Sequence, residues 1–114
     1  MKFRVKVEVY GFDVVFLTNK SVAEKLTGLS GCGYDYCHSV DGCNTIYVLC
    51  HNEKLSLTPT YLSCVSHELN HASMRILEAV GFQLDYNNQE PLCYLQDFLM
   101  KKVLEKLWKE VIDG

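Results

Sequence analysis

Alternation of apolar and polar residues dominates the start of the chain and predicts β-strands. Residues 2–9 change character at nearly every position, which is the period of a strand with one buried face. The apolar residues of that face are Phe3, Val5, Val7 and Val9. A turn at Tyr10-Gly11-Phe12 leads into a second strand over residues 13–18, so we expect a β-hairpin.

A short helix is predicted after this hairpin. Ser21 stands three residues before Glu24, which is the spacing of a capping box, where each side chain caps the backbone of the other residue. The helix should run to about Leu26. Gly28 and Gly31 should end it, because glycine adopts the left-handed conformation that closes helices.

A second hairpin is expected between residues 34 and 50. Residues 34–39 and 44–50 contain many β-forming side chains, and Val40-Asp41-Gly42 lies between them. Asp-Gly between two such segments is a strong hairpin signal.

From Thr58 onward the apolar spacing becomes helical. Thr58 is a good capping residue, Pro59 suits the first helical position and Gly81 ends the pattern, so a helix is predicted over residues 59–80. Its core face should contain Leu62, Val65, Leu69, Ile76 and Val80.

A last helix is predicted from Glu90 to about Ile112, with Asn88 as its cap. Its apolar stripe consists of Leu92, Leu95, Leu99, Val103, Leu107 and Val111. The predicted fold is therefore α+β, in a single domain over residues 1–114. A small twisted antiparallel or mixed sheet of two hairpins should pack on a short helix and two long helices.

Composition agrees with an ordinary globular domain. Of the 114 residues, 48% are hydrophobic and 22% charged, and the formal net charge is −3. So mild a charge suggests neither nucleic acid nor an anionic membrane as a partner. The first residues alternate charged and apolar side chains where a signal peptide would need an unbroken apolar run. We therefore expect a cytoplasmic protein. We also expect it to be a monomer or a weak homodimer.

The chain contains six cysteines, at positions 32, 37, 43, 50, 64 and 93. Without a secretory signal we expect reduced thiols. No two of them form a C-x-x-C pair, which disfavours a structural zinc site. Such a site would use Cys32, Cys37, His38 and Cys43. Small buried residues explain most of the cysteines as well.

Candidate chemistry is concentrated in the sequence His67-Glu68-Leu69-Asn70-His71. Residues four apart lie above one another on a helix, so His67 and His71 can bind one zinc ion together. Glu68 lies beside them and can act as general base toward a water molecule. Both histidines fall outside the predicted core face. The alternative is a surface helix with two unrelated histidines.

Catalytic zinc usually has three protein ligands, so a third must come from elsewhere. The candidates are His38, His51, Glu78, Glu90 and the cysteines. Glu90 is preferred, because it begins a helix that should fold back along the histidine helix and whose N-terminus favours an ionised carboxylate. Glu78 could instead orient His71. Tyr94, one turn beyond Glu90, could donate a hydrogen bond to an oxyanion, although tyrosine there is more often a packing residue.

The motif His67-Glu68-x-x-His71 followed by Glu90 resembles the gluzincin metallopeptidases. Residues 66–72 together with residues 88–95 resemble small phage and prophage metallopeptidases that are similar to minigluzincins, and the likeness extends over about residues 58–100. It implies a minimal zincin fold with Zn²⁺ bound by His67, His71 and Glu90. It also implies that the protein is located in the cytoplasm of a phage-infected or lysogenic host cell.

The resemblance further implies a peptide or protein substrate that lies along an edge strand. Residues 44–50 are expected to be this edge, with Asn44, Ile46 and Val48 binding the substrate. Two other functions use the same residues. One is a zinc amidase that acts on a non-protein amide, and the other is a latent or inactive zincin-fold module that binds or regulates a partner.

Overall fold

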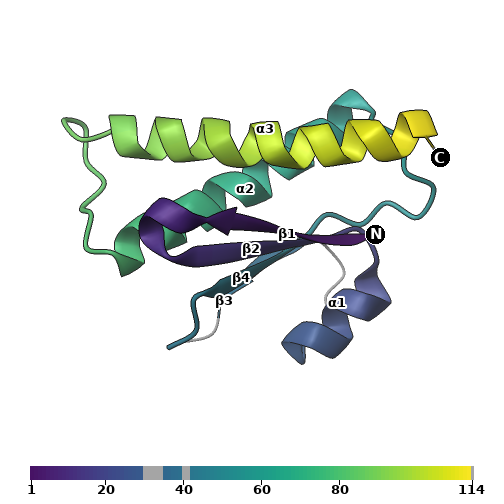
Figure 1. Ribbon diagram of the computed structural model, residues 1–114, viewed down its shortest axis with the longest axis horizontal. Coiled ribbons are helices and arrows are strands. Elements are labelled where there is room, and N and C mark those ends of the chain that lie inside the picture. Colours follow the sequence, from purple (N-terminus) through teal and green to yellow (C-terminus); the bar gives the residue numbers. More distant parts are fainter. Residues whose placement is uncertain (30–34, 40–41, 114) are drawn as a thin grey trace.

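A four-stranded mixed sheet forms the middle layer of the computed structural model, which describes residues 1–29, 35–39 and 42–113 (Figure 1). The order of the strands is β1-β2-β4-β3. Their bounds are Lys2–Val7 for β1, Phe12–Leu17 for β2, Tyr36–Ser39 for β3 and Thr45–Leu49 for β4. Together with three helices this is the predicted α+β class.

The first hairpin is confirmed, but it turns earlier than the alternation suggested. β1 and β2 pair antiparallel, with Val5 opposite Val14. β1 ends at Val7 because residues Glu8–Tyr10 form a short 3-10 helix, η1, which Gly11 closes at a φ of 70°. Val9 is therefore 82% exposed, and its predicted place in the core is wrong.

The predicted pairing of the second hairpin is also confirmed, since β3 and β4 are antiparallel. β4 additionally pairs with β2 in parallel, so it lies inside the sheet. The prediction that residues 44–50 form an edge is thus wrong, because a strand with two neighbours has no free backbone groups for a third. The outer strands are β1 and β3.

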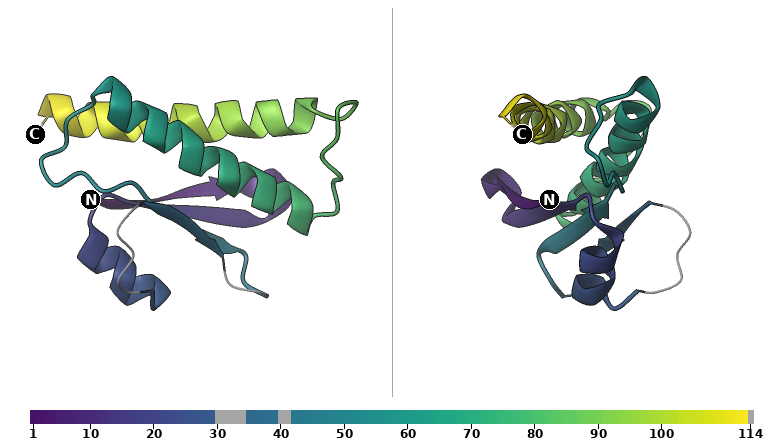
Figure 2. Two further views of the ribbon diagram at one scale, coloured as in Figure 1. Left: turned by 180° about the vertical axis from the view of Figure 1, so that it is seen from behind. Right: turned by 90° about the vertical axis from the view of Figure 1, so that its right-hand side faces the viewer.

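Helix α1, Lys20–Thr27, covers one face of the sheet (Figure 2). Its cap differs from the predicted capping box. Asn19 is the N-cap, and its side chain accepts a hydrogen bond of 3.0 Å from the Val22 backbone N–H. Gly28 ends the helix as predicted, and the other predicted terminator, Gly31, lies outside the described residues.

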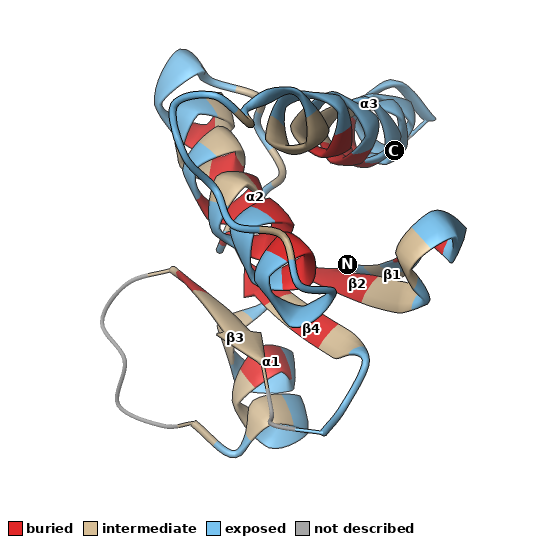
Figure 3. Cartoon of the chain, turned by 90° about the vertical axis from the view of Figure 1, so that its left-hand side faces the viewer, coloured by how far each residue is buried: buried red, intermediate tan, exposed pale blue. Residues whose placement is uncertain are grey.

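Two long helices, α2 (Pro59–Ala79) and α3 (Glu90–Asp113), cover the opposite face (Figures 1 and 2). On this side the buried residues of α2 and α3 pack on the alternate strand residues that face them (Figure 3). This cluster includes Val14, Phe16, Ile46, Val48, Val65, Leu69, Ile76, Leu95, Leu99, Val103 and Leu107. The predicted stripes are largely confirmed by this packing.

The ends of both stripes are exposed, however. Val80 and Val111 are about 40% exposed, so their predicted places in the core are wrong. Leu62 is only partly buried, so its predicted place in the core is confirmed only in part. Ala72 and Leu77 of α2 are fully buried instead. Within the described residues, no helix combines the length and the apolarity that crossing a membrane requires.

α2 and α3 cross each other and diverge toward the end where α3 begins (Figures 1 and 2). Gln96 of α3 marks the crossing, because its side-chain amide contacts the Ser66 carbonyl oxygen at 3.1 Å and the Ser73 hydroxyl at 3.3 Å. The first turn of α3 lies beyond this contact, on the diverging side.

The cap of α2 provides a test of the fold. The Thr58 hydroxyl accepts a hydrogen bond of 3.1 Å from the Tyr61 backbone N–H, so Thr58→Ala should lower the free energy of unfolding by about 1 kcal/mol. Urea unfolding followed by circular dichroism measures this. Thr60→Ala, in the exposed first turn of the same helix, is the matched control and should cost less than about 0.5 kcal/mol. Equal losses in the two variants would contradict the cap.

Candidate metal centre

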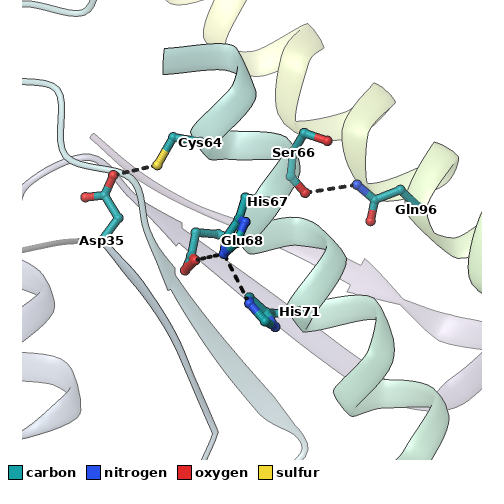
Figure 4. A network of polar contacts seen from close by, with 7 residues as sticks. All are labelled: Asp35, Cys64, Ser66, His67, Glu68, His71 and Gln96. Atoms are coloured by element: carbon teal, nitrogen blue, oxygen red, sulfur yellow. Dashed lines mark hydrogen bonds and ion pairs between the residues drawn. The ribbon is translucent and has the colours of Figure 1, made fainter. Parts of the chain in front are cut away.

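Three side chains of α2 meet on one face of the helix (Figure 4). The Nε2 atoms of His67 and His71 are 3.2 Å apart, and a carboxylate oxygen of Glu68 lies 3.7 Å from the His67 nitrogen. Both histidines are exposed, whereas Glu68 is only 6% exposed. The predicted cluster therefore forms, with two accessible imidazoles beside a buried carboxylate.

The separation of the two histidine nitrogens suits a shared metal ion. Two nitrogens bound to one tetrahedral zinc ion at about 2.0–2.1 Å lie about 3.3 Å apart. In His67 and His71 the two Nε2 atoms already have nearly this distance. The separation of the two nitrogens therefore fits a shared ion, which would replace the contact between the two rings.

The side chain of Glu68 is buried, but its carboxylate is not fully hydrogen-bonded within the described part of the chain. Among the described residues, its Oε2 atom has no hydrogen-bond partner, and such an atom typically costs about 1–3 kcal/mol. Burial raises the pKa of Glu68, while the neighbouring charges of His67 and His71 act to lower it. A cation held by the histidines would favour the ionised carboxylate and relieve this cost, so the residues present fit a bound metal ion.

Glu90 does not join this cluster. It is exposed in the first turn of α3, and the donors that the structure brings within 4.8 Å of one another here are His67, Glu68 and His71. The crossing at Gln96 explains the separation, because α3 has diverged from α2 by the time its first turn is reached (Figure 1). The preferred third ligand is thus absent from the arrangement that the structure describes.

Tyr94 lies on a different surface. It is 70% exposed and lines a hollow of about 460 Å³ together with η1 and Val7 of β1. The histidines are not part of that lining. The structure therefore does not bring the predicted oxyanion donor to the metal centre.

The three residues expected to bind substrate are divided by the fold. Val48 is fully buried in the core, which excludes contact with a substrate. Asn44 and Ile46 line a hollow of about 760 Å³ at the C-terminal end of α2. Arg75 and Glu78, one and two turns beyond His71, line the same hollow. Arg75, one turn beyond His71, therefore connects this hollow with the helix that carries the histidines.

Arg75 joins α2 to β3, an outer strand of the described sheet. Its guanidinium donates a hydrogen bond of 2.8 Å to the Ser39 hydroxyl of β3. Glu78 is exposed, and within the described residues it makes no hydrogen bond with His71, so a role in orienting that imidazole has no support. His51, another candidate ligand, accepts a hydrogen bond from the Lys20 backbone N–H instead.

A second group of possible ligands was not predicted. Asp35, Cys50 and Cys64 place their donor atoms within 4.8 Å of one another. They come from three segments with no motif spacing, so the sequence contains no signal that could have found them. The disfavoured zinc site of Cys32, Cys37, His38 and Cys43 cannot be compared with it, because Cys32 lies outside the described residues.

Comparison with known proteins adds no family assignment. No protein-family model, no curated protein and no solved structure matches this chain.

Removing the charge of Glu68 tests its burial in the metal-free protein. Burial raises the pKa of Glu68 in the folded protein. The protonated carboxyl group therefore adds stability below the pKa that Glu68 has in the unfolded chain, and this stability is lost as the pH rises through the pKa in the folded protein. With a chelator present, Glu68→Gln should therefore be more stable than wild type by about 1 kcal/mol at pH 7, and the difference should shrink in acid.

Urea unfolding between pH 4 and 7 measures this difference. Glu78→Gln, an exposed glutamate on the same helix, is the control and should show no pH-dependent gain over wild type. A Glu68→Gln variant that is less stable than wild type at pH 7 would show that the ionised carboxylate is well compensated.

Proposed function

We propose that this protein is a zinc-dependent hydrolase that cleaves a peptide bond. The observation that supports it best is the pair of histidine Nε2 atoms 3.2 Å apart next to the buried, incompletely bonded carboxylate of Glu68. A surface helix with two unrelated histidines gives no reason to bury a glutamate between them. The pattern agrees with the resemblance of residues 66–72 to zincin active-site helices.

In this proposal each side chain of the cluster has a separate task. His67 and His71 hold the ion through their Nε2 atoms. When bound, zinc supplies Lewis acidity, which polarises a carbonyl group and makes water more acidic. Glu68 takes the proton of the attacking water and passes it to the leaving amine. Its burial makes it a stronger base once ionised, which suits both transfers.

The substrate is proposed to lie along β3 instead of β4. Among the described residues β3 is the outer strand nearest to α2, and an extended peptide can add to the outer side of such a strand. From there the hollow of about 760 Å³ continues past Arg75 and Ser39. The positive charge of Arg75 favours a substrate with a carboxylate on that side of the cleaved bond.

A minimal zincin fold remains part of this proposal, without the glutamate ligand on α3 that the gluzincin type would need. The mixed sheet over α2, with β3 as the outer strand, provides the helix and edge that such a fold needs. Two histidines alone bind zinc weakly, so a third ligand has to complete the site. In the arrangement of the structure the first turn of α3 does not supply it.

Replacement of both histidines tests metal binding. The double variant His67→Ala/His71→Ala should lose about one zinc ion per chain relative to wild type, because each histidine supplies one ligand. Inductively coupled plasma mass spectrometry of protein purified without chelators measures this loss. Equal zinc contents in the two proteins would overturn the proposed centre.

Turnover is tested with Glu68→Gln. This variant should keep its zinc and lose hydrolysis of a synthetic peptide mixture by at least about 100-fold, because only the proton carrier is removed. Glu110→Gln, an exposed glutamate on α3 that is not in the lining of the hollow of about 760 Å³, is the control and should keep wild-type activity. Retained activity in Glu68→Gln would exclude Glu68 as the base. Zinc binding without cleavage of any peptide would favour the amidase or the binding module.

The role of Glu90 is tested by zinc affinity. Since Glu90 lies outside the cluster, Glu90→Ala should bind zinc within about twofold of wild type, whereas His71→Ala should lose about 100-fold or more. Competition with a chromophoric chelator gives both constants. A comparable loss in Glu90→Ala would show that α3 closes onto the histidines when zinc binds.

A further inference from the structure

A second group of possible metal ligands consists of Asp35, Cys50 and Cys64. Cys64 lies on α2 about one turn before His67, and Figure 4 shows it beside Asp35. The Cys64 thiol donates a hydrogen bond of 2.9 Å to Asp35 Oδ2, and the Cys50 sulfur lies within 4.8 Å of both ligand atoms. We propose that Asp35, Cys50 and Cys64 bind a thiophilic divalent cation such as zinc. This site goes beyond the proposed hydrolase centre and shares no ligand with it.

The three ligands are held in place by contacts that need no metal ion. Cys50 follows β4 directly; its backbone N–H donates to the Leu17 carbonyl oxygen, and its own carbonyl accepts a 2.8 Å hydrogen bond from the Tyr61 hydroxyl. The other oxygen of Asp35 accepts a 2.8 Å hydrogen bond from the His51 backbone N–H. The site is therefore largely preorganised, which lowers the entropic cost of binding an ion.

The distances suit a tetrahedral ion with two sulfur ligands and one oxygen ligand. With a Zn–S distance of about 2.3 Å and a Zn–O distance of about 2.0–2.2 Å, the ligand atoms of one ion lie about 3.5–3.8 Å apart. The donors of this group already lie within 4.8 Å of one another, with Cys64 Sγ and Asp35 Oδ2 at 2.9 Å, so shifts of about 1 Å in these atoms would give the separations of a bound ion. A water molecule can fill the fourth position.

The chemistry of the group selects a soft cation over magnesium or calcium. Thiolates favour zinc and its softer relatives, whereas the hard cations require oxygen ligands. Binding releases the protons of Cys50 and Cys64 to solvent, and Asp35 exchanges the hydrogen bond from the Cys64 thiol for a bond to the ion. The resulting bonds join three segments that are far apart in the sequence.

The site would fix the position of β3 relative to α2. Asp35 immediately precedes β3, Cys50 follows β4, and Cys64 stands three residues before His67. An ion bound here ties the proposed substrate edge to the helix that presents the histidines. Its role is therefore structural, and we expect the metal to raise the melting temperature.

Cobalt(II) distinguishes the two sites, because only a thiolate ligand gives an intense sulfur-to-cobalt charge-transfer band. Anaerobic titration of the reduced protein with cobalt should produce this band with a stoichiometry of about one ion per chain. The variant His67→Ala/His71→Ala should keep the band in full. Loss of hydrolysis by that variant with an unchanged band would show that the two centres are independent.

Variants at the new site complete the test. Cys64→Ser should abolish or strongly weaken the band, and Asp35→Asn should weaken cobalt binding at least about tenfold. Cys93→Ser, an exposed cysteine on α3, is the matched control and should behave as wild type. Circular dichroism of each variant confirms that it folds, and Cys50 is left unchanged because it is fully buried. Absence of the band in wild type, or its persistence in folded Cys64→Ser, would overturn the proposal.

Discussion

The packing of the apolar face of α2 on the sheet fixes everything else on that helix. Leu69 is fully buried against the strands, and each of His67 and His71 is two residues away from it, hence about 160° round the helix. The histidines must therefore be exposed. Glu68, only about 100° from Leu69, lies at the boundary between core and solvent. Burial of the leucine thus makes position 68 poorly solvated, and a carboxylate occupies this position beside two imidazoles where an apolar residue would satisfy the packing.

This arrangement makes the candidate centre costly in the metal-free protein. An incompletely bonded carboxylate oxygen and a raised pKa at Glu68 have no benefit for the fold itself. Features of this kind concentrate at functional sites, where a protein gives up stability for reactivity. The same face continues in both directions, toward Cys64 and Asp35 at one end and toward Arg75 and its hollow at the other.

The parallel pairing of β4 with β2 determines which surfaces remain open. It places β4 inside the sheet and leaves β3 as the outer strand beside α2. The presence of two hairpins does not specify this parallel pairing, because each hairpin forms around its own turn. The two hairpins could pair with each other in more than one strand order. The central position of β4 also buries Val48 and brings Cys50 close to Cys64.

By itself the sequence determined the local elements and the motif. Periodicity located the long helices, the cap at Thr58 and the hairpins, since these depend on neighbours within a few residues. Four-residue spacing likewise brought His67 and His71 together. Only the tertiary structure decided which strand is the edge and where α3 crosses α2. The crossing places Glu90 and Tyr94 away from the histidines. Packing of the elements also brings Asp35, Cys50 and Cys64 together. Those contacts join residues far apart in the chain, and their geometry follows from how whole elements pack, which no local pattern encodes.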